Sequence, residues 1–383
     1  MRRTLSGLLV LLMFLTLGAL AEDEEISFLD LTGGNQNQAE ATPDPSVPSP
    51  TPAITPSADG SVLLTMSFTG DVTIGGDVRK SGKSIFDKEL DKQKGDLNFP
   101  MRNVKDIFAM DDMTLVNFEG TLTTAPINPD KSDNSFLFSA PTSYVQILTS
   151  GNIEAVSLEN NHVMDHGTAG YEETQQTLRD AGIIYSGGGQ LGVFTAQGVQ
   201  IAMLSYQTFD QYPAIFDQVP KDVAAAKAQY PIVIVSFHWG AEKDYAPNDN
   251  QQKLGKITID AGADLVIGHH SHRINPIEIY KGKYICYSLG NFSFAGNAKP
   301  SDMSTYIFQT RFRVKDGVAA PEGFRIIPCR ISSRSDYNDF APTPYDDDSS
   351  VESLLNVLRD NGKLLQNPVS NYPLDWPPEI TSP

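Results

Sequence analysis

The chain is poor in cysteine, with only Cys286 and Cys329 among its 383 residues. Neither has the spacing of a thiolate zinc site, so a metal site built on cysteine is excluded. A disulfide is compatible with an exported protein, and burial of two small apolar side chains fits equally well. No cysteine lies near the N-terminus, which argues against a lipid-anchored lipoprotein.

Positive charge is also scarce. The 29 Lys and Arg residues against 47 Asp and Glu residues give a formal net charge of −18. Nucleic acid is therefore excluded as a partner, because affinity for phosphate backbones comes mainly from clustered lysine and arginine. Residues 22–60 contain no lysine or arginine and are rich in Pro, Ser, Thr and acid. This composition predicts a disordered tether.

Long hydrophobic runs are limited to the N-terminus. Arg2 and Arg3 precede an apolar run over residues 8–17, and Ala19-Leu20-Ala21 has the pattern that signal peptidase accepts. We expect residues 1–21 to be a signal peptide and the protein to be exported, to an extracellular or cell-surface location. Anchoring by an uncleaved N-terminal segment is the alternative, although the run is shorter than the ~20 residues of a membrane span.

Residues 61–334 have the length of one large α/β domain. Period-two alternation over residues 64–69 predicts a first strand ending at Gly70-Asp71, and a basic run after it reads as a solvated loop. Later apolar runs and amphipathic stretches predict alternating strands and helices, followed by closely spaced strands. Residues 335–383 read as a Pro- and Asp-rich tail with one short helix. The predicted strands are 114–118, 155–158, 201–205, 232–237, 265–267, 274–280, 283–288, 305–314 and 323–331, and the predicted helices are 142–149, 168–181, 251–261 and 351–358.

All six histidines fall in three short motifs, each directly after a predicted strand. Open α/β sheets build their sites at the carboxyl ends of strands, so this distribution predicts a metal site. Carboxylate, amide and imidazole ligands suit Mn, Fe or Zn better than calcium. Taken singly, each candidate also has a structural explanation, such as a cap, a turn or an ion pair. The candidates are Asp71, Glu119, Asn161, His162, His238, His269 or His270, and His272.

Six ordered motifs over residues 66–294 resemble the CapA (poly-γ-glutamate synthesis) family, a branch of the calcineurin-like metallophosphoesterase superfamily. The resemblance implies a four-layer α/β/β/α sandwich with mixed sheets, of the metallophosphatase type. The motifs are Phe68-Thr69-Gly70-Asp71, Asn117-Phe118-Glu119-Gly120, residues 160–167 from Asn160 to Gly167, His238-Trp239-Gly240-Ala241-Glu242, Gly268-His269-His270-Ser271-His272, and Ser288-Leu289-Gly290-Asn291-Phe292.

The resemblance implies one or two divalent transition-metal ions. Asp71 and His272 would hold the first, Glu119 would lie between the two, and the second would be held by Asn161, His238 and His270. His270 is preferred to His269 because residues two apart on an extended segment point to the same side. At position 73 the wider superfamily has histidine where this chain has threonine. One ion is therefore expected to be loosely held or absent.

Further residues of these motifs are expected to assist the chemistry. His162 would protonate a leaving oxygen or stabilise charge. Asp165 would either orient the His162 ring or cap the following helix. The remaining candidates, expected to support a ligand or contact substrate, are Glu242, His269, Arg273 and Asn291.

The leading hypothesis is an exported metal-dependent hydrolase that acts in the synthesis, attachment or export of an anionic surface polymer such as poly-γ-glutamate, with a membrane capsule-synthesis complex as partner. A second hypothesis is a non-catalytic polymer-binding or scaffold component. A third is a secreted metallophosphoesterase acting on a phosphorylated substrate without a capsule role. The sequence does not decide whether the bond cleaved is a phosphoester or an amide.

Overall fold

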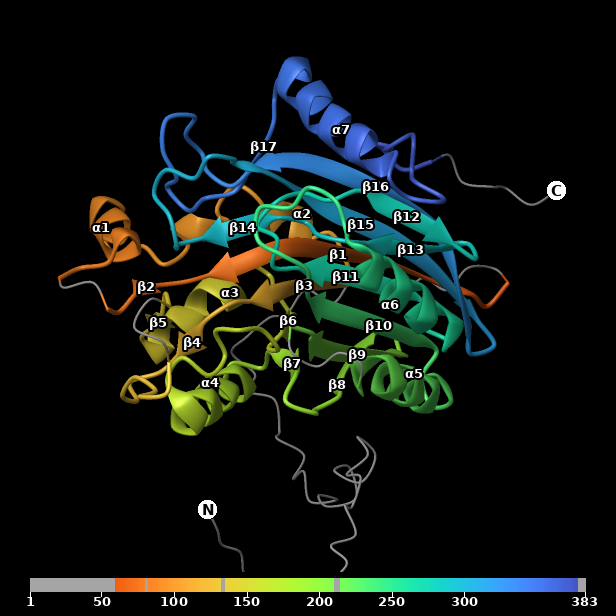
Figure 1. Ribbon diagram of the computed structural model, residues 1–383, viewed down its shortest axis with the longest axis horizontal. Coiled ribbons are helices and arrows are strands. Elements are labelled where there is room, and N and C mark those ends of the chain that lie inside the picture. The colour runs from red at the N-terminus through yellow and green to blue at the C-terminus, as the bar shows by residue number, and fades with distance from the viewer. Residues whose placement is uncertain (1–58, 80–81, 132–134, 210–213, 378–383) are drawn as a thin grey trace, which may run out of the picture.

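The computed structural model describes residues 59–79, 82–131, 135–209 and 214–377 (Figure 1). The predicted signal peptide and nearly all of the predicted tether lie outside these residues. Within them, the chain forms two large sheets and a small one. The first has the order β17-β16-β15-β1-β3-β6-β7, with β14 also paired to β1, and the second has the order β12-β13-β11-β10-β9-β8. The small sheet has the order β2-β5-β4.

The strands have the following bounds: β1 Val62–Thr73, β2 Gly76–Asp77, β3 Met113–Phe118, β4 Thr121–Leu122, β5 Phe138–Ala140, β6 Ala155–Ser157, β7 Ile184–Ser186, β8 Gly192–Ala196, β9 Val199–Gln207, β10 Ile232–His238, β11 Leu265–His269, β12 Ile277–Tyr280, β13 Lys283–Cys286, β14 Asn291–Phe294, β15 Ser304–Lys315, β16 Val318–Arg330 and β17 Thr343–Pro344. The helices are α1 Ile85–Lys92, η2 Phe99–Met101, α2 Lys105–Phe108, η3 Thr142–Val145, α3 Gln146–Ser150, α4 Gly167–Asp180, α5 Ala214–Lys227, α6 Asp249–Asp260 and α7 Asp348–Gly362.

Both large sheets are mixed. In the first, β1, β3, β6 and β7 run parallel, and β15 is antiparallel to β1. In the second, β9, β10, β11 and β13 run parallel, and β8 and β12 are antiparallel at the two edges. Parallel strands such as β10 and β11 carry nearly continuous apolar runs because both of their faces are covered. Their carboxyl ends all point to the same end of the molecule.

The core lies in layers that follow from the alternation of side chains along each strand. Met66 of β1 packs in one apolar cluster with Ile234 of β10, so the two sheets face each other. The next residue of β10, Val235, packs instead with α5 and α6. The outer face of the first sheet packs with α1 to α4 through residues such as Val116. Figure 1 shows α5 and α6 on one side and α1, α3 and α4 on the other. The predicted four-layer α/β/β/α sandwich with mixed sheets is confirmed.

Several elements differ from the sequence predictions. The basic run expected as a loop contains α1, whose N-cap Ser84 accepts a hydrogen bond from the Asp87 amide. Helix α5 and strand β14 were not predicted, and the strand expected from residue 274 begins only at Ile277. The helix expected over residues 351–358 extends over Asp348–Gly362, capped by Asp347.

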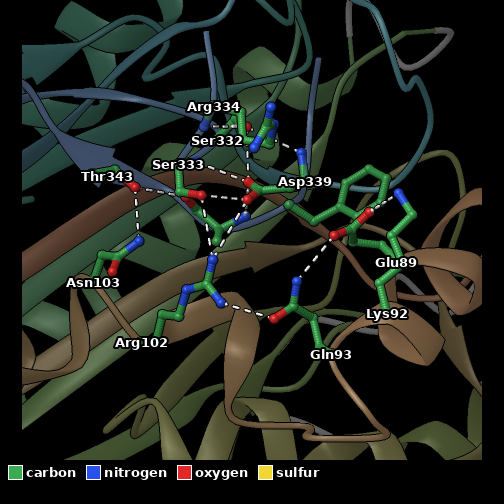
Figure 2. Close-up of polar contacts among 12 residues, drawn as sticks. Glu89, Lys92, Gln93, Arg102, Asn103, Ser332, Ser333, Arg334, Asp339 and Thr343 are labelled. Atoms are coloured by element: carbon green, nitrogen blue, oxygen red, sulfur yellow. Dashed lines mark hydrogen bonds and ion pairs between the residues drawn. The ribbon is translucent and has the colours of Figure 1, made fainter. Parts of the chain in front are cut away.

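Packing continues beyond residue 334. Asp339 is 2% exposed and accepts hydrogen bonds from the Ser332 hydroxyl and the Ser333 amide, both at 2.8 Å. Arg102, which follows η2, lies 3.6 Å from the same carboxylate, and Asn103 donates to Thr343 at 2.8 Å (Figure 2). This polar network ties the segment after β16 to the helical layer on the first sheet.

Among the described residues, no helix combines the length and the apolar character needed to cross a bilayer.

Candidate metal centre

The candidate residues lie at the carboxyl ends of strands from both sheets. Asp71 is part of β1 and Glu119 directly follows β3, whereas His238 and His269 end β10 and β11. Contacts cross between the sheets: His269 Nδ1 lies 3.5 Å from Asp71 Oδ1, and His238 Nε2 lies 3.8 Å from Glu119 Oε1. The cluster therefore lies at the seam where the two sheets meet.

A close approach of β1 and β14 fixes the position of Asp71. The Asp71 amide donates to the Gly290 carbonyl at 2.9 Å. A Cβ atom on Gly70 would lie 1.9 Å from that carbonyl oxygen, so only glycine fits at position 70. Asn291 is paired in register with Asp71, and its Oδ1 lies 2.8 Å from His272 Nδ1. The Gly70-Asp71 motif thus places the carboxylate, and the Gly290-Asn291 motif places its neighbour His272.

Asp71, Glu119 and His272 form a possible metal-ligand triad. One ligand atom from each lies within 4.8 Å of the others. Asp71 and Glu119 are fully buried, and His272 Nδ1 lies 3.3 Å from Asp71 Oδ2. This is the set expected around the first ion, with Glu119 between the two.

The buried polar atoms of this cluster fit a cation. Both carboxylate oxygens of Glu119 and Oδ2 of Asp71 are buried without a hydrogen-bond partner among the described residues. Both ring nitrogens of His269 and Nδ1 of His270 share this property. Burying so many unpaired polar atoms is costly unless something compensates them. A divalent metal bound by carboxylate and imidazole provides that compensation, and the donor set suits a transition metal.

The residues expected around a second ion lie next to Glu119. His238 Nε2 is 2.8 Å from Asn161 Oδ1, and the ring centroids of His238 and His270 are 4.7 Å apart. Asn161, His238 and His270 are therefore gathered in one place. Their assignment to a second ion stays a prediction.

His270 was preferred to His269 on the assumption of an extended backbone, but His270 and His272 have φ values of 91° and 53°, in the left-handed region. The chain turns at each of these residues, so alternate side chains need not share a side. His269 contacts Asp71, and His270 lies beside His238, so both rings line the cluster.

Two buried asparagines in the same motifs connect the candidate ligands, and neither was among the site residues predicted from the sequence. Asn117 Nδ2 donates to Asp71 Oδ1 at 2.8 Å and lies 3.3 Å from His238 Nδ1. Asn160 Nδ2 donates to the Phe118 carbonyl at 2.8 Å, and its Oδ1 accepts from the His162 amide. Asn117 could have been recognised from the sequence, because it is a polar residue near the end of β3, a strand that is buried throughout.

The two buried carboxylates respond differently to their surroundings. Burial raises the pKa of Glu119 to about 8, and the negative charge of Asp71 adds to this effect. Burial alone would also raise the pKa of Asp71, but the adjacent imidazoles of His269 and His272 outweigh it and hold that pKa well below its usual range. Two adjacent buried carboxylates disfavour simultaneous ionisation, and a bound cation would reverse this effect.

The imidazoles also differ in the direction in which their pKa values are shifted. Burial lowers the pKa of His238 well below its ordinary value, and burial together with the His272 charge lowers the pKa of His270 to about 4. Burial acts against His272 too, but the charges of Glu119 and Asp71 raise its pKa to about 9. His238 and His270 are consequently neutral near pH 7, which is the form that binds metal.

His162 is held in place by Asp165. The His162 Nδ1 lies 2.8 Å from Asp165 Oδ2, and Lys131 Nζ lies 2.8 Å from the other carboxylate oxygen. The opposite ring nitrogen, Nε2, lies 3.8 Å from Glu119 Oε1. Helix α4 has His166 as its N-cap without a side-chain bond, so the alternative in which Asp165 caps this helix is wrong.

A cavity of about 280 Å³ opens beside the cluster. His162 and His272 line it, together with Glu242, Arg273 and Asn291. The candidates expected to support a ligand or contact substrate are therefore found around the cavity, except His269, which lies against Asp71. Glu242 is exposed, and no hydrogen bond joins it to an imidazole in the described part of the chain.

The two-sheet sandwich and the buried cluster of carboxylates and imidazoles define an α/β protein with a candidate metal centre at the carboxyl ends of its strands. The chain belongs to the family described as bacterial capsule synthesis protein PGA_cap, whose family model matches residues 65–295. The predicted membership of the CapA family is thus confirmed.

Curated relatives agree with this assignment. The PGA biosynthesis protein CapA of Bacillus subtilis is 32% identical over 252 residues, which cover 61% of this chain and 63% of the relative. The capsule biosynthesis protein CapA of Bacillus anthracis is 29% identical over 257 residues, covering 60% of each chain. The chain therefore matches less than two thirds of the length of these relatives.

Two solved structures show more distant likeness. A novel phosphatase of Mycoplasma pneumoniae is 13% identical with a TM-score of 0.43, covering 76% of this chain and 97% of the other. The calcineurin-like phosphoesterase YfkN of Bacillus subtilis is 15% identical with a TM-score of 0.40, covering 79% and 99%.

Proposed function

We propose that this chain is an exported, metal-dependent hydrolase that acts in the synthesis, attachment or export of an anionic surface polymer such as poly-γ-glutamate. The observation that carries the proposal is the buried cluster of Asp71, Glu119 and His272 beside a cavity, in which Asp71 Oδ2 and both Glu119 oxygens lack hydrogen-bond partners among the described residues. Family membership and the capsule and PGA roles named for the two CapA relatives support the polymer role.

The residues have distinct tasks in this proposal. Asp71, Glu119 and His272 hold one divalent ion, and Asn161, His238 and His270 hold a second next to Glu119. Such an ion supplies Lewis-acid chemistry and lowers the pKa of bound water. Mn, Fe and Zn all match these donors.

His162 carries the proton transfer. Its ring lines the cavity, while Asp165 engages Nδ1 at 2.8 Å and so fixes which nitrogen faces Glu119. A positioned imidazole of this kind can give a proton to a leaving oxygen or nitrogen. The same geometry serves a phosphoester or an amide, so both bonds are tested.

The first experiment measures bound metal and hydrolysis on the full chain. Metal content is determined by mass spectrometry, and turnover of an aryl phosphate and of a γ-glutamyl amide is followed with added manganese. We expect manganese-dependent turnover of one of them, lost at least ~100-fold in Glu119→Gln and His238→Ala because ligands are removed. His166→Gln is the matched control, because His166 bonds the Ala125 carbonyl rather than a cluster residue.

Other outcomes point to the other hypotheses. Bound metal without turnover of either substrate would favour a non-catalytic polymer-binding component. Turnover of the phosphate alone, with surface polymer unchanged in cells lacking the protein, would favour a secreted phosphoesterase. Absence of bound metal after reconstitution would contradict the proposal.

A further inference from the structure

A second cavity, of about 170 Å³, lies where β7 of the first sheet meets β9 of the second. It shares no lining residue with the cavity beside the candidate centre. Its walls include Glu159, which follows β6, residues 188–189, which follow β7, and residues 204–207 at the end of β9. The hydroxyl oxygens of Ser186 and Ser205 lie 2.6 Å apart and join the two sheets at this place.

This second cavity is close to the candidate metal centre. Gln207, in its wall, is paired in register with His238 on the neighbouring strand. Glu159 precedes Asn161 by two positions in the chain. A group bound in the second cavity would therefore lie near the candidate ligands without occupying the larger cavity.

Glu159 is the only charged side chain among the described residues that line the second cavity. It is partly buried, and its Oε2 accepts a hydrogen bond from the Gly188 amide. Within the described residues, its Oε1 accepts no hydrogen bond and no lysine, arginine or histidine pairs with it. A carboxylate withdrawn from water without a counter-ion is costly, so the cavity favours a cationic occupant and disfavours an anion.

The backbone holds this carboxylate in a fixed position. Gly188 has a φ of 58°, and a Cβ atom there would lie 2.5 Å from the Tyr171 hydroxyl oxygen. The turn after β7 therefore packs against α4 and requires glycine. Because the Gly188 amide fixes one oxygen of Glu159, little entropy is lost when a ligand binds the other.

Neutral oxygen atoms surround the carboxylate. The Tyr206 hydroxyl donates to Asp222 Oδ2 at 2.9 Å, so its oxygen is left as an acceptor. Gln207 and Gln218 each add an amide carbonyl to the wall. A primary ammonium has three N–H donors and no acceptor, which matches one carboxylate together with such neutral acceptors.

The size and composition of the second cavity limit the cation. A volume of about 170 Å³ holds roughly five groups of the size of a water molecule, enough for an ammonium on a short aliphatic chain. Leu204 provides an apolar wall for such a chain. A divalent metal is not favoured here, because the described residues around this cavity form no group of three metal-binding side chains.

We propose that the second cavity is a binding site for a primary ammonium group carried on a short aliphatic chain, with Glu159 as its counter-ion and the carbonyls of Gln207 and Gln218 as further acceptors. This site goes beyond the proposed function, because it brings an aliphatic amine next to the candidate centre. It requires neither bound metal nor hydrolysis.

Equilibrium binding to the full chain tests this assignment. The probes are N-acetyl-lysine amide, its norleucine analogue, which lacks the ammonium, and its trimethyllysine analogue, which keeps the charge but has no N–H donor. Each is titrated calorimetrically without added metal at about 0.15 M salt, where long-range attraction to the acidic chain is largely screened. We expect the lysine probe to bind at least ~10-fold more tightly than either analogue, because only it forms charge-assisted hydrogen bonds.

Three variants make the result specific. Glu159→Gln should remove the preference for the lysine probe, because it keeps an acceptor for the Gly188 amide but loses the charge. Glu172→Gln removes an exposed acid of α4 and, as the matched control, should leave every affinity unchanged. Gln207→Glu adds a carboxylate to the wall and should tighten binding of the lysine probe about threefold, a gain that misfolding cannot produce.

Equal affinity of the lysine and norleucine probes for the unsubstituted protein would overturn the proposal. An equal loss of affinity in Glu159→Gln and Glu172→Gln would do so too, because it would indicate general attraction of a cation to an acidic chain. Equal binding of the lysine and trimethyllysine probes would contradict the role given to the carbonyl acceptors. Since no metal is added, none of these outcomes depends on the proposed hydrolase activity.

Discussion

Lys131 is the residue whose role was least visible in the sequence. Its ammonium pairs with Asp165 Oδ1 at 2.8 Å and donates to the Asn161 carbonyl at 2.6 Å. It therefore holds both the carboxylate that orients His162 and the backbone of a candidate ligand. No short motif contains it, since it lies 30 residues before Asn161 in the chain.

Lys131→Met is predicted to lower the hydrolysis rate about 10-fold, because residues that support catalytic or ligand side chains typically contribute 10- to 100-fold. The rate constant kcat should fall more than KM changes, since Lys131 does not line the cavity. Steady-state kinetics measure both constants. Lys88→Met, which removes an exposed lysine of α1, is the control, and equal loss in the two variants would refute the role given to Lys131.

A second prediction at the scale of a residue concerns the effect of pH on Asp111, which lies away from the candidate metal centre. Burial raises the pKa of Asp111 to about 8, aided by the nearby charges of Glu154 and Asp112 against hydrogen bonds from Ser67 and Thr114. The folded state therefore keeps a proton that the unfolded state loses near pH 4. Stability should fall as pH rises from about 4 to 8, because the folded state then binds more protons than the unfolded state.

Asp111→Asn should remove this contribution. The free energy of unfolding, measured in urea at several pH values between 4 and 9, should decline less steeply in the variant than in the unsubstituted protein. Asp106→Asn, an exposed acid in the nearby helix α2, should leave the decline unchanged. If the free energy of unfolding declined equally with pH in Asp111→Asn and in the unsubstituted protein, Asp111 would be ionised in the folded state.

At the scale of elements, the contact between β1 and β14 makes a sharp prediction. Gly70→Ala should abolish metal binding and destabilise the fold, because its Cβ would overlap the Gly290 carbonyl oxygen. Gly60→Ala is the matched control, since φ there is 77° but no atom lies within 4 Å of the added Cβ. It should cost only about 1 kcal/mol of backbone strain. Metal titration and thermal unfolding compare the two, and normal metal affinity in Gly70→Ala would contradict the prediction.

The strands that build the centre were predictable because they are buried on both faces. The apolar runs at β10 and β11 are typical of buried strands, and the polar residues at their ends marked the site. Helix α5 was missed because Pro220 lies inside it, and proline is normally a sign that a helix has ended. Strand β14 was missed because it has only four residues, which is at the lower limit for recognising an alternating pattern.

The orientation of individual side chains was less predictable than the elements. His270 was preferred on the assumption of an extended chain, whereas the folded chain turns at His270 and His272. The roles of Asn117 and Lys131 likewise depend on contacts between residues far apart in the chain. Hydrophobic periodicity predicts local secondary structure, and it does not predict contacts between residues that are far apart in the sequence.

At the scale of the whole molecule, the candidate ligands come from both sheets. Asp71 and Glu119 belong to the first sheet and His238 to the second. A cation bound only by the folded state should therefore stabilise it, by about 2.7 kcal/mol at a free concentration 100 times the dissociation constant. We predict that manganese raises the melting temperature and that a chelator reverses the rise.

Glu119→Gln should show no such rise, whereas His166→Gln should show it in full. Differential scanning calorimetry with graded manganese concentrations provides the measurement. A melting temperature independent of manganese in the unsubstituted protein, at concentrations where binding is saturated, would rule out a shared ion between the sheets.

The position of Asn117 has a mechanical consequence. Its single amide group touches Asp71 on one sheet and lies beside His238 on the other, so a small slide between the two layers must move both side chains at once. Cation affinity would then fall as soon as the two sheets shift relative to each other, before any helix or strand unfolds.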